Sequence, residues 1–133
     1  MQGMTGANDK IRLVMSIVPQ GYYLANSCNY ILPSKSIDLY CLLGILNSKV
    51  INWFFRCFST NSNVNGYEVD NFPIPQLDIN TQVKISDLVK KVIRDKQTNN
   101  STDTSALEKQ IDDFIYQAYE LSNDDIRIIE ESV

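Results

Sequence analysis

Histidine is absent from this 133-residue chain. Its absence excludes Ser-His-Asp and Cys-His nucleophile pairs, the usual general base at neutral pH, and histidine metal sites. Pairs of acidic residues remain at Asp112-Asp113 and Asp124-Asp125. Adjacent side chains on a helix point about 100° apart, so they do not converge on one substrate atom. We interpret both pairs as solvated helix faces and expect no catalytic residues here.

Cysteine is scarce as well. Cys28, Cys41 and Cys57 form no C-x-x-C pair, and their odd number argues against a disulfide framework. Two of them lie in an apolar stretch, where cysteine usually packs as a small hydrophobic side chain. We expect reduced cysteines, no metal site and a cytoplasmic protein.

No hydrophobic run is long and pure enough to span a membrane. The longest apolar stretch, residues 37–58, contains Asp38, Lys49 and Arg56, and a spanning helix tolerates few such residues. Residues 1–9 are polar and contain glycine, unlike a secretory signal, and we interpret them as a leader or domain boundary.

Positive charge is limited. Residues 1–76 carry five bases and four acids, a net charge of +1, whereas residues 77–133 carry seven bases and twelve acids, a net charge of −5. A stand-alone DNA-binding protein usually carries a basic excess. Any DNA affinity of the isolated chain should therefore be weak, and its acidic second half should face protein or solvent.

The hydrophobic pattern predicts an α+β fold, with a small β-rich half around a buried helix and a C-terminal helical tail. A period of two predicts a strand over residues 10–18, and shorter strands are expected at 22–24, 29–32 and 67–69. A buried helix is expected over residues 37–46.

Capping signals place the helix ends. Ser36 is the expected N-cap of the buried helix, and Asn47-Ser48 indicates a stop followed by a second, aromatic helical segment. Pro73-Ile74-Pro75 should be held extended by its prolines.

The second half should be helical. Amphipathic helices are predicted over residues 80–96 and 105–121, the latter opened by a Ser105–Glu108 capping box, and a short helix should follow Ser122. We divide the chain into a leader (1–9), a core (10–76) and a helical tail (77–133).

Two motifs occur in the order of a known family. The sequence LLGILNSK at 42–49, a polar loop with Gly66, and FPIP at 72–75 resemble the C-terminal target-recognition domain of TaqI-type adenine-specific DNA methyltransferases and their fused type IIG restriction-modification relatives. Type I specificity subunits look similar at the same place. Residues 107–130 resemble the family's ending, LExxIDxxVYxLYgLtxxEIxxIE.

The resemblance implies a sequence-reading module of a restriction-modification enzyme. The parent would transfer a methyl group from S-adenosylmethionine to adenine N6 after flipping the base, and would need Mg²⁺ where a nuclease is fused. This chain lacks a glycine-rich cofactor loop, an Asn/Asp-Pro-Pro-aromatic motif and an Asp/Glu-x-Lys nuclease signature. We therefore expect no cofactor and no catalysis in this chain, and expect double-stranded DNA and the catalytic methyltransferase domain as its partners.

The loop over residues 59–67 is the candidate base-reading segment. Asn61, Asn63 and Asn65 can each offer a donor and an acceptor to an adenine edge in the major groove. Gly66 permits close backbone approach, and Tyr67 could stack or act as a wedge. The alternative is an ordinary polar surface loop.

Basic residues are the candidates for phosphate contacts. Lys49 and Arg56 lie seven residues apart, nearly two helical turns, and should share one face. Such contacts position a protein without reading sequence. Lys35, Ser34 and Arg12 are secondary candidates, and a solvated face is the alternative interpretation.

A protein-interaction module is the competing function. The helices at 80–96 and 105–121 could pair with another subunit or a second copy, as in type I specificity subunits, and the acidic excess of the tail favours this role for it.

Overall fold

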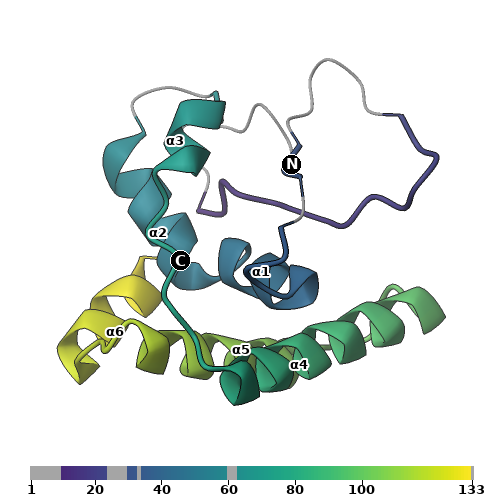
Figure 1. Ribbon diagram of the computed structural model, residues 1–133. Coiled ribbons are helices and arrows are strands. Elements are labelled where there is room, and N and C mark those ends of the chain that lie inside the picture. Colours follow the sequence, from purple (N-terminus) through teal and green to yellow (C-terminus); the bar gives the residue numbers. More distant parts are fainter. Residues whose placement is uncertain (1–9, 24–29, 33, 60–62, 133) are drawn as a thin grey trace.

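Helices make up the regular structure of this protein. The computed structural model describes residues 10–23, 30–32, 34–59 and 63–132 (Figure 1). Its helices are α1 (Leu39–Leu46), α2 (Lys49–Phe58), α3 (Gly66–Asp70), α4 (Ile79–Thr98), α5 (Ser105–Ala118) and α6 (Asn123–Glu131). Those ranges contain no sheet, and their β structure amounts to a bridge assignment at Asn63. The predicted α+β fold is therefore wrong.

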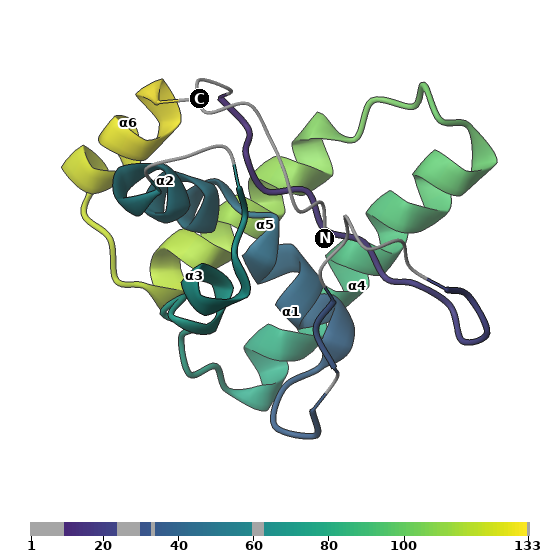
Figure 2. The same cartoon turned by 90° about the horizontal axis from the view of Figure 1, so that it is seen from above.

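The expected strand at residues 10–18 is a segment without regular structure that crosses over α1 and α2 (Figures 1 and 2). Burial still alternates along it: Leu13 and Met15 are 3% and 8% exposed, whereas Val14 between them is 53% exposed. The period of two was read correctly, but no neighbouring strand in the described chain completes a ladder.

Two asparagine side chains hold this segment in place of a strand. Asn47 accepts from the backbone N–H of Met15 at 2.8 Å and donates to its carbonyl at 2.9 Å. Asn52 accepts from the N–H of Arg12 at 2.8 Å and donates to the Lys10 carbonyl at 2.8 Å. Each amide therefore satisfies backbone groups that pairing with a strand would otherwise satisfy.

The other expected strands are also absent from the described residues. Residues 67–69 lie inside α3, where the side chain of Glu68 accepts from the backbone N–H of Asn65 at 3.3 Å and so secures the first turn. Residues 22–23 and 30–32 have no regular structure. Leu24 and Asn29 lie outside the described residues.

The break between α1 and α2 was predicted correctly in its main feature. Ser48 is the N-cap of α2 and accepts from the N–H of Ile51 at 3.3 Å. The N-cap of α1 is Asp38, which accepts from Cys41 N–H at 3.0 Å, and not Ser36. Asp38 wins because its carboxylate reaches an unpaired N–H of the first turn.

The helical tail is confirmed as three helices, α4 to α6. Residues Ser122 and Asp125 form a capping box at α6, with hydrogen bonds of 3.2 and 3.1 Å. The capping box expected at Ser105 is absent, because Ser105 is already inside α5 and Asp103 accepts from its N–H at 3.0 Å. The helix also ends at Ala118, short of the predicted residue 121.

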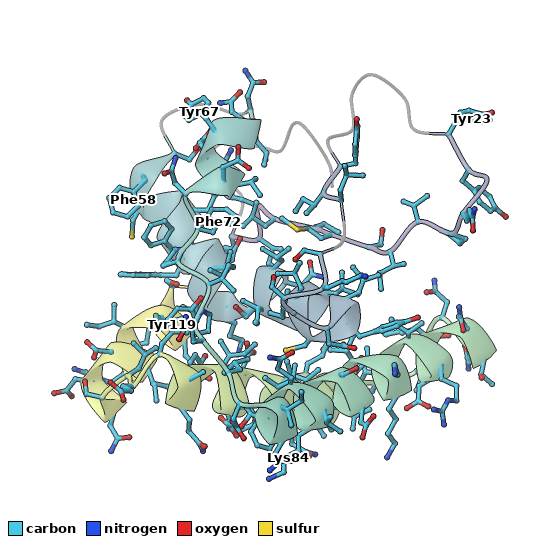
Figure 3. The ribbon with its side chains drawn as sticks, in the orientation of Figure 1. Tyr23, Phe58, Tyr67, Phe72, Lys84 and Tyr119 are labelled. Carbon is cyan, nitrogen blue, oxygen red and sulfur yellow. The ribbon has the colours of Figure 1, made fainter. Side chains whose placement is uncertain are left out.

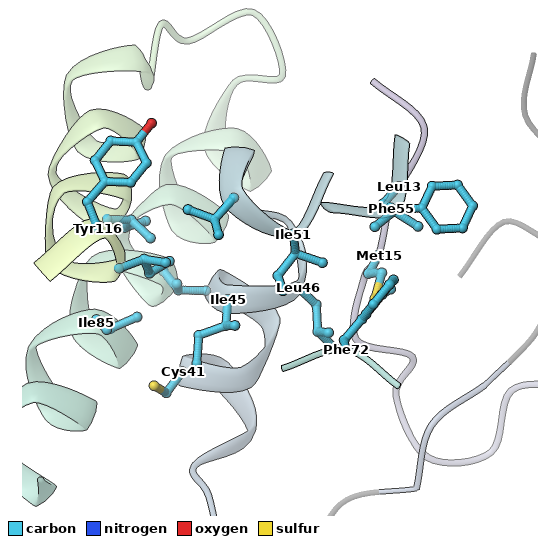
Figure 4. Close-up of a cluster of buried hydrophobic side chains, with 14 of the residues drawn as sticks. Leu13, Met15, Cys41, Ile45, Leu46, Ile51, Phe55, Phe72, Ile85 and Tyr116 are labelled. Carbon is cyan, nitrogen blue, oxygen red and sulfur yellow. The ribbon is translucent and has the colours of Figure 1, made fainter. Parts of the chain in front are cut away.

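The core lies between α1–α2 and the tail. Helix α1 packs on α4, and α4 packs on α5 (Figure 2). Gly44 allows the close approach, since a Cβ there would lie 2.9 Å from Cγ2 of Val89. Buried side chains from both halves form one cluster (Figure 4): Leu13, Met15, Cys41, Ile45, Leu46, Val50, Ile51, Phe55, Val64, Phe72, Ile85, Val89, Ile111, Ile115, Tyr116 and Ile129. The division at residue 76 stays a prediction.

Among the described residues, no helix has the length and apolar character needed to cross a bilayer.

Candidate functional site

The predicted reading loop leads into α3. Val64 anchors it in the core at 2% exposure, while the neighbouring Asn63 is exposed. Asn61 lies outside the described residues. A buried side chain beside an exposed one fixes the backbone and so limits the positions that the polar side chain can adopt.

Asn65 is held by the turn that it begins. Its Nδ2 donates to Oε1 of Glu68 at 2.7 Å and lies 3.4 Å from the hydroxyl of Tyr67. A base contact by this amide must therefore compete with, or add to, its contact with Glu68. The side chain is half-buried.

Gly66 and Tyr67 form the most open part of the loop. A Cβ placed on Gly66 would meet no atom within 4 Å, so the fold itself does not require glycine there. Tyr67 is 68% exposed. Both features leave room for another molecule to approach this backbone and stack on this ring.

Phe58 is an exposed aromatic side chain that the sequence analysis did not select. It is also 68% exposed and lies at the same end of the molecule as Tyr67 (Figure 3). The available signal was a phenylalanine at the last position of a helix, directly before a polar loop. We define the reading surface as Phe58, Asn63, Asn65, Gly66 and Tyr67.

Aromatic packing connects this surface to the core. The ring of Phe54 lies 4.7 Å from that of Phe58 and 6.2 Å from that of Phe72, which is buried. On the next residue, Pro73, the carbonyl accepts from the hydroxyl of Tyr119. The chain leaving α3 is thereby tied to α5, so the tail helps to set where the loop lies.

Arg12 supports the loop from inside. It is 2% exposed, its guanidinium lies 4.8 Å from the ring centre of Phe55, and its Nη1 donates to Oγ of Ser59 at 3.1 Å. Because Ser59 is the C-cap of α2, this contact ties the N-terminal segment to the start of the loop. The arrangement favours a supporting role, and a phosphate contact by Arg12 stays a prediction.

Lys49 and Arg56 face the C-terminal tail. Lys49 Nζ lies 3.6 Å from Oε1 of Glu130, and Arg56 Nη1 donates to the carbonyl of Ser132. Phosphate binding by either side chain requires it to leave or share these partners. Lys35 is exposed in the turn before α1. The structure tests none of these assignments.

A buried carboxyl lies where α2 meets the tail. Asp112 accepts from the backbone N–H of Lys49 at 3.2 Å. Burial raises the pKa of Asp112 to about 6, with further contributions from Glu130 and Asp113, while the hydrogen bond and charge of Lys49 act in the opposite direction. Burial likewise raises the pKa of Tyr116, whose hydroxyl donates to Glu130 at 3.2 Å. The group joins helices and offers no open position for a substrate.

A metal centre finds no support in the described ranges, where no three His, Cys, Asp or Glu residues are placed to hold an ion.

Comparison with known proteins locates the first motif. A family model described as the TaqI-like C-terminal specificity domain matches residues 5–74, more than half of the chain. The match includes α1, the Asn47-Ser48 break, α2, the loop and α3, and ends at Ile74. No curated protein and no solved structure matches this chain.

Proposed function

The chain belongs to the family of TaqI-like C-terminal specificity domains, and on this basis we propose that it recognises the DNA target of an adenine-specific methyltransferase, a type IIG restriction-modification enzyme. The observation that carries the proposal is the family match, which covers the whole loop and α3. The chain supplies shape and base-edge readout, and the parent enzyme supplies the chemistry.

The residue types of the reading surface suit base recognition. An asparagine amide can make two hydrogen bonds to N6 and N7 of adenine in the major groove. Exposed aromatic rings such as Phe58 and Tyr67 can stack on bases or wedge between base steps. The buried side chain of Val64 and the Arg12–Ser59 contact hold the ends of this segment.

Phosphate contacts are the weak point of the isolated chain. Its net charge is −4, and the reading surface contains no basic side chain. Counterion release, which dominates DNA affinity, is therefore small. We assign most phosphate contacts, the S-adenosylmethionine site and any Mg²⁺ needed for cleavage to the rest of the parent enzyme.

The competing function uses the tail helices as an interaction module. Helices α4 and α5 turn their buried residues toward α1 and toward each other, so these faces are already covered within one chain. Self-association through 80–96 and 105–121 stays a prediction that no contact of the described residues favours.

Selection from a random pool of duplex DNA tests the proposal. The full chain is immobilised at high density, to compensate for weak affinity, and the duplexes retained at low salt are sequenced. We expect one enriched sequence, which the double variant Asn63→Ala with Asn65→Ala loses, because each genuine base contact is worth roughly 1–3 kcal/mol of discrimination.

Two further variants control this experiment. Tyr67→Ala removes an exposed ring and leaves the Asn65–Glu68 contact in place, so its loss of enrichment cannot be ascribed to unfolding. Asn80→Ala changes an exposed asparagine on α4 and should enrich the wild-type sequence. Equal enrichment by all four proteins, or none by the wild type, contradicts the proposal.

A further inference from the structure

A long uncharged stretch lies in the N-terminal part of the chain. No charged residue occurs between Arg12 and Lys35, although the chain contains 12 basic and 16 acidic residues. Within the described part of this stretch, seven large apolar side chains are exposed: Val14, Val18, Tyr22, Tyr23, Tyr30, Ile31 and Leu32. Contiguous exposed apolar surface of this kind marks interaction sites. The absence of basic residues makes a phosphate backbone a poor partner for it.

Residues 13–18 have the burial pattern of a strand. Leu13 and Met15 point into the core, whereas Val14, Ser16 and Val18 are exposed. In an extended chain, alternate residues direct their N–H and C=O groups to opposite edges. Both backbone groups of Met15 are bound by Asn47, so one edge of this segment is already paired.

The other edge is open. The backbone groups of Val14, Ser16 and Val18 make no hydrogen bond to any described residue. Proteins normally protect such an edge with lysine, proline or a bulge, and none of residues 13–18 is charged or proline. Pro19 follows only at the end of the edge.

An apolar groove runs beside this edge. It has a volume of about 690 Å³ and is lined by the segment, by α1 and by Val89, Val92 and Ile93 of α4. Its position provides apolar side chains next to unpaired backbone groups, a combination that suits an added strand.

We propose that a second copy of this chain occupies this edge. The two segments pair antiparallel about a twofold axis at Ser16, so that Ser16 faces Ser16 of the other copy and each Val14 faces a Val18. Charge favours this occupant: two copies with a net charge of −4 repel one another over most of their surfaces, but not across an uncharged segment.

This inference concerns a different surface from the reading surface and stands independently of the proposed function. It also places self-association on the N-terminal segment, away from the outer faces of α4 and α5.

Sedimentation of the full chain over a range of concentrations tests the pairing. The wild type should shift from the mass of one chain to that of two. Ser16→Lys places like charges opposite each other at the axis and should raise the dissociation constant by about tenfold or more. The same substitution reduces the net charge from −4 to −3, which would favour association if overall repulsion decided the outcome.

A mixing experiment fixes the register. Ser16→Glu should also prevent self-association, whereas an equimolar mixture of the Ser16→Lys and Ser16→Glu proteins should associate, because opposite charges then meet at the axis. Val83→Lys is the matched control: Val83 is 52% exposed on α4, and its variant should associate like the wild type. Circular dichroism establishes that each variant is folded.

Three results would overturn the proposal: a wild type that keeps the mass of one chain at every concentration, a Val83→Lys variant that dissociates while Ser16→Lys does not, or a mixture that fails to associate. In the first case the edge belongs to a strand of another protein.

Discussion

Replacing Asp112 by asparagine should change how stability depends on pH. Asp112 is 7% exposed on α5 and accepts from the first N–H of α2 at 3.2 Å. Asparagine keeps an acceptor oxygen for the Lys49 N–H and removes the buried charge. The groups facing this carboxyl are Lys49 on α2, Glu130 on α6, and Asp113 and Tyr116 on α5.

The sign follows from the direction of the pKa shift. Burial raises the pKa of Asp112 from 3.8 to about 6 in the folded chain, so the folded state holds a proton over a pH range in which the unfolded state has released it. Stability from this group is therefore present below pH 3.8 and is lost as the pH rises to about 6. A difference of this size corresponds to at most about 3 kcal/mol.

Urea unfolding from pH 4 to pH 7 measures this effect. We expect Asp112→Asn to reduce the fall in stability of the wild type over that range, and to be the more stable protein at pH 7. Asp113→Asn is the matched control, because Asp113 is exposed and its ion pair with Lys109, at 3.4 Å, contributes little. A variant less stable than the wild type at pH 7, with the same pH dependence, would refute the reasoning.

Three further substitutions or reactions probe the core. Gly44→Ala should lower stability by about 1–2 kcal/mol in thermal unfolding, since its Cβ would crowd α4 and the gain in helix propensity offsets this only partly. Asn52→Ala should cost about 1–3 kcal/mol for each buried backbone group left unpaired, whereas Asn80→Ala should cost almost nothing. Iodoacetamide should label the exposed Cys57 in the folded chain and reach the buried Cys41, whose pKa is raised to about 11, only on unfolding.

Features with a local cause were predictable from the sequence. The break at Asn47-Ser48 and the start of α6 at Ser122 each depend on a capping side chain within three residues. Amphipathic periodicity likewise indicated α4 and α5 to within a few residues at most ends. These signals are local because a helix satisfies its hydrogen bonds within its own sequence.

Strand formation has no such local cause. The alternation at Leu13 and Met15 correctly predicted burial, but a strand also needs a neighbour, and here the side chains of Asn47 and Asn52 bind the backbone instead. The five residues of α3 are too few to show a helical period, so their alternating pattern favoured the wrong element.

The candidate site shows the same division. The exposure of Tyr67 agrees with a polar loop, whereas the burial of Arg12 depends on contacts with Phe55 and Ser59, far away in the sequence. Spacing alone could place Lys49 and Arg56 on one face but could not show that this face meets α6.

Nuclear magnetic resonance titration of the full chain with random-sequence duplex DNA at low salt tests the central claim most directly, because it detects weak binding and locates it. The account predicts that the largest amide shift changes fall on Asn63, Asn65, Gly66 and Tyr67. Shift changes centred instead on the basic residues of α4, such as Lys84 and Lys91, which lie away from the reading surface (Figure 3), or no changes at all, would contradict it.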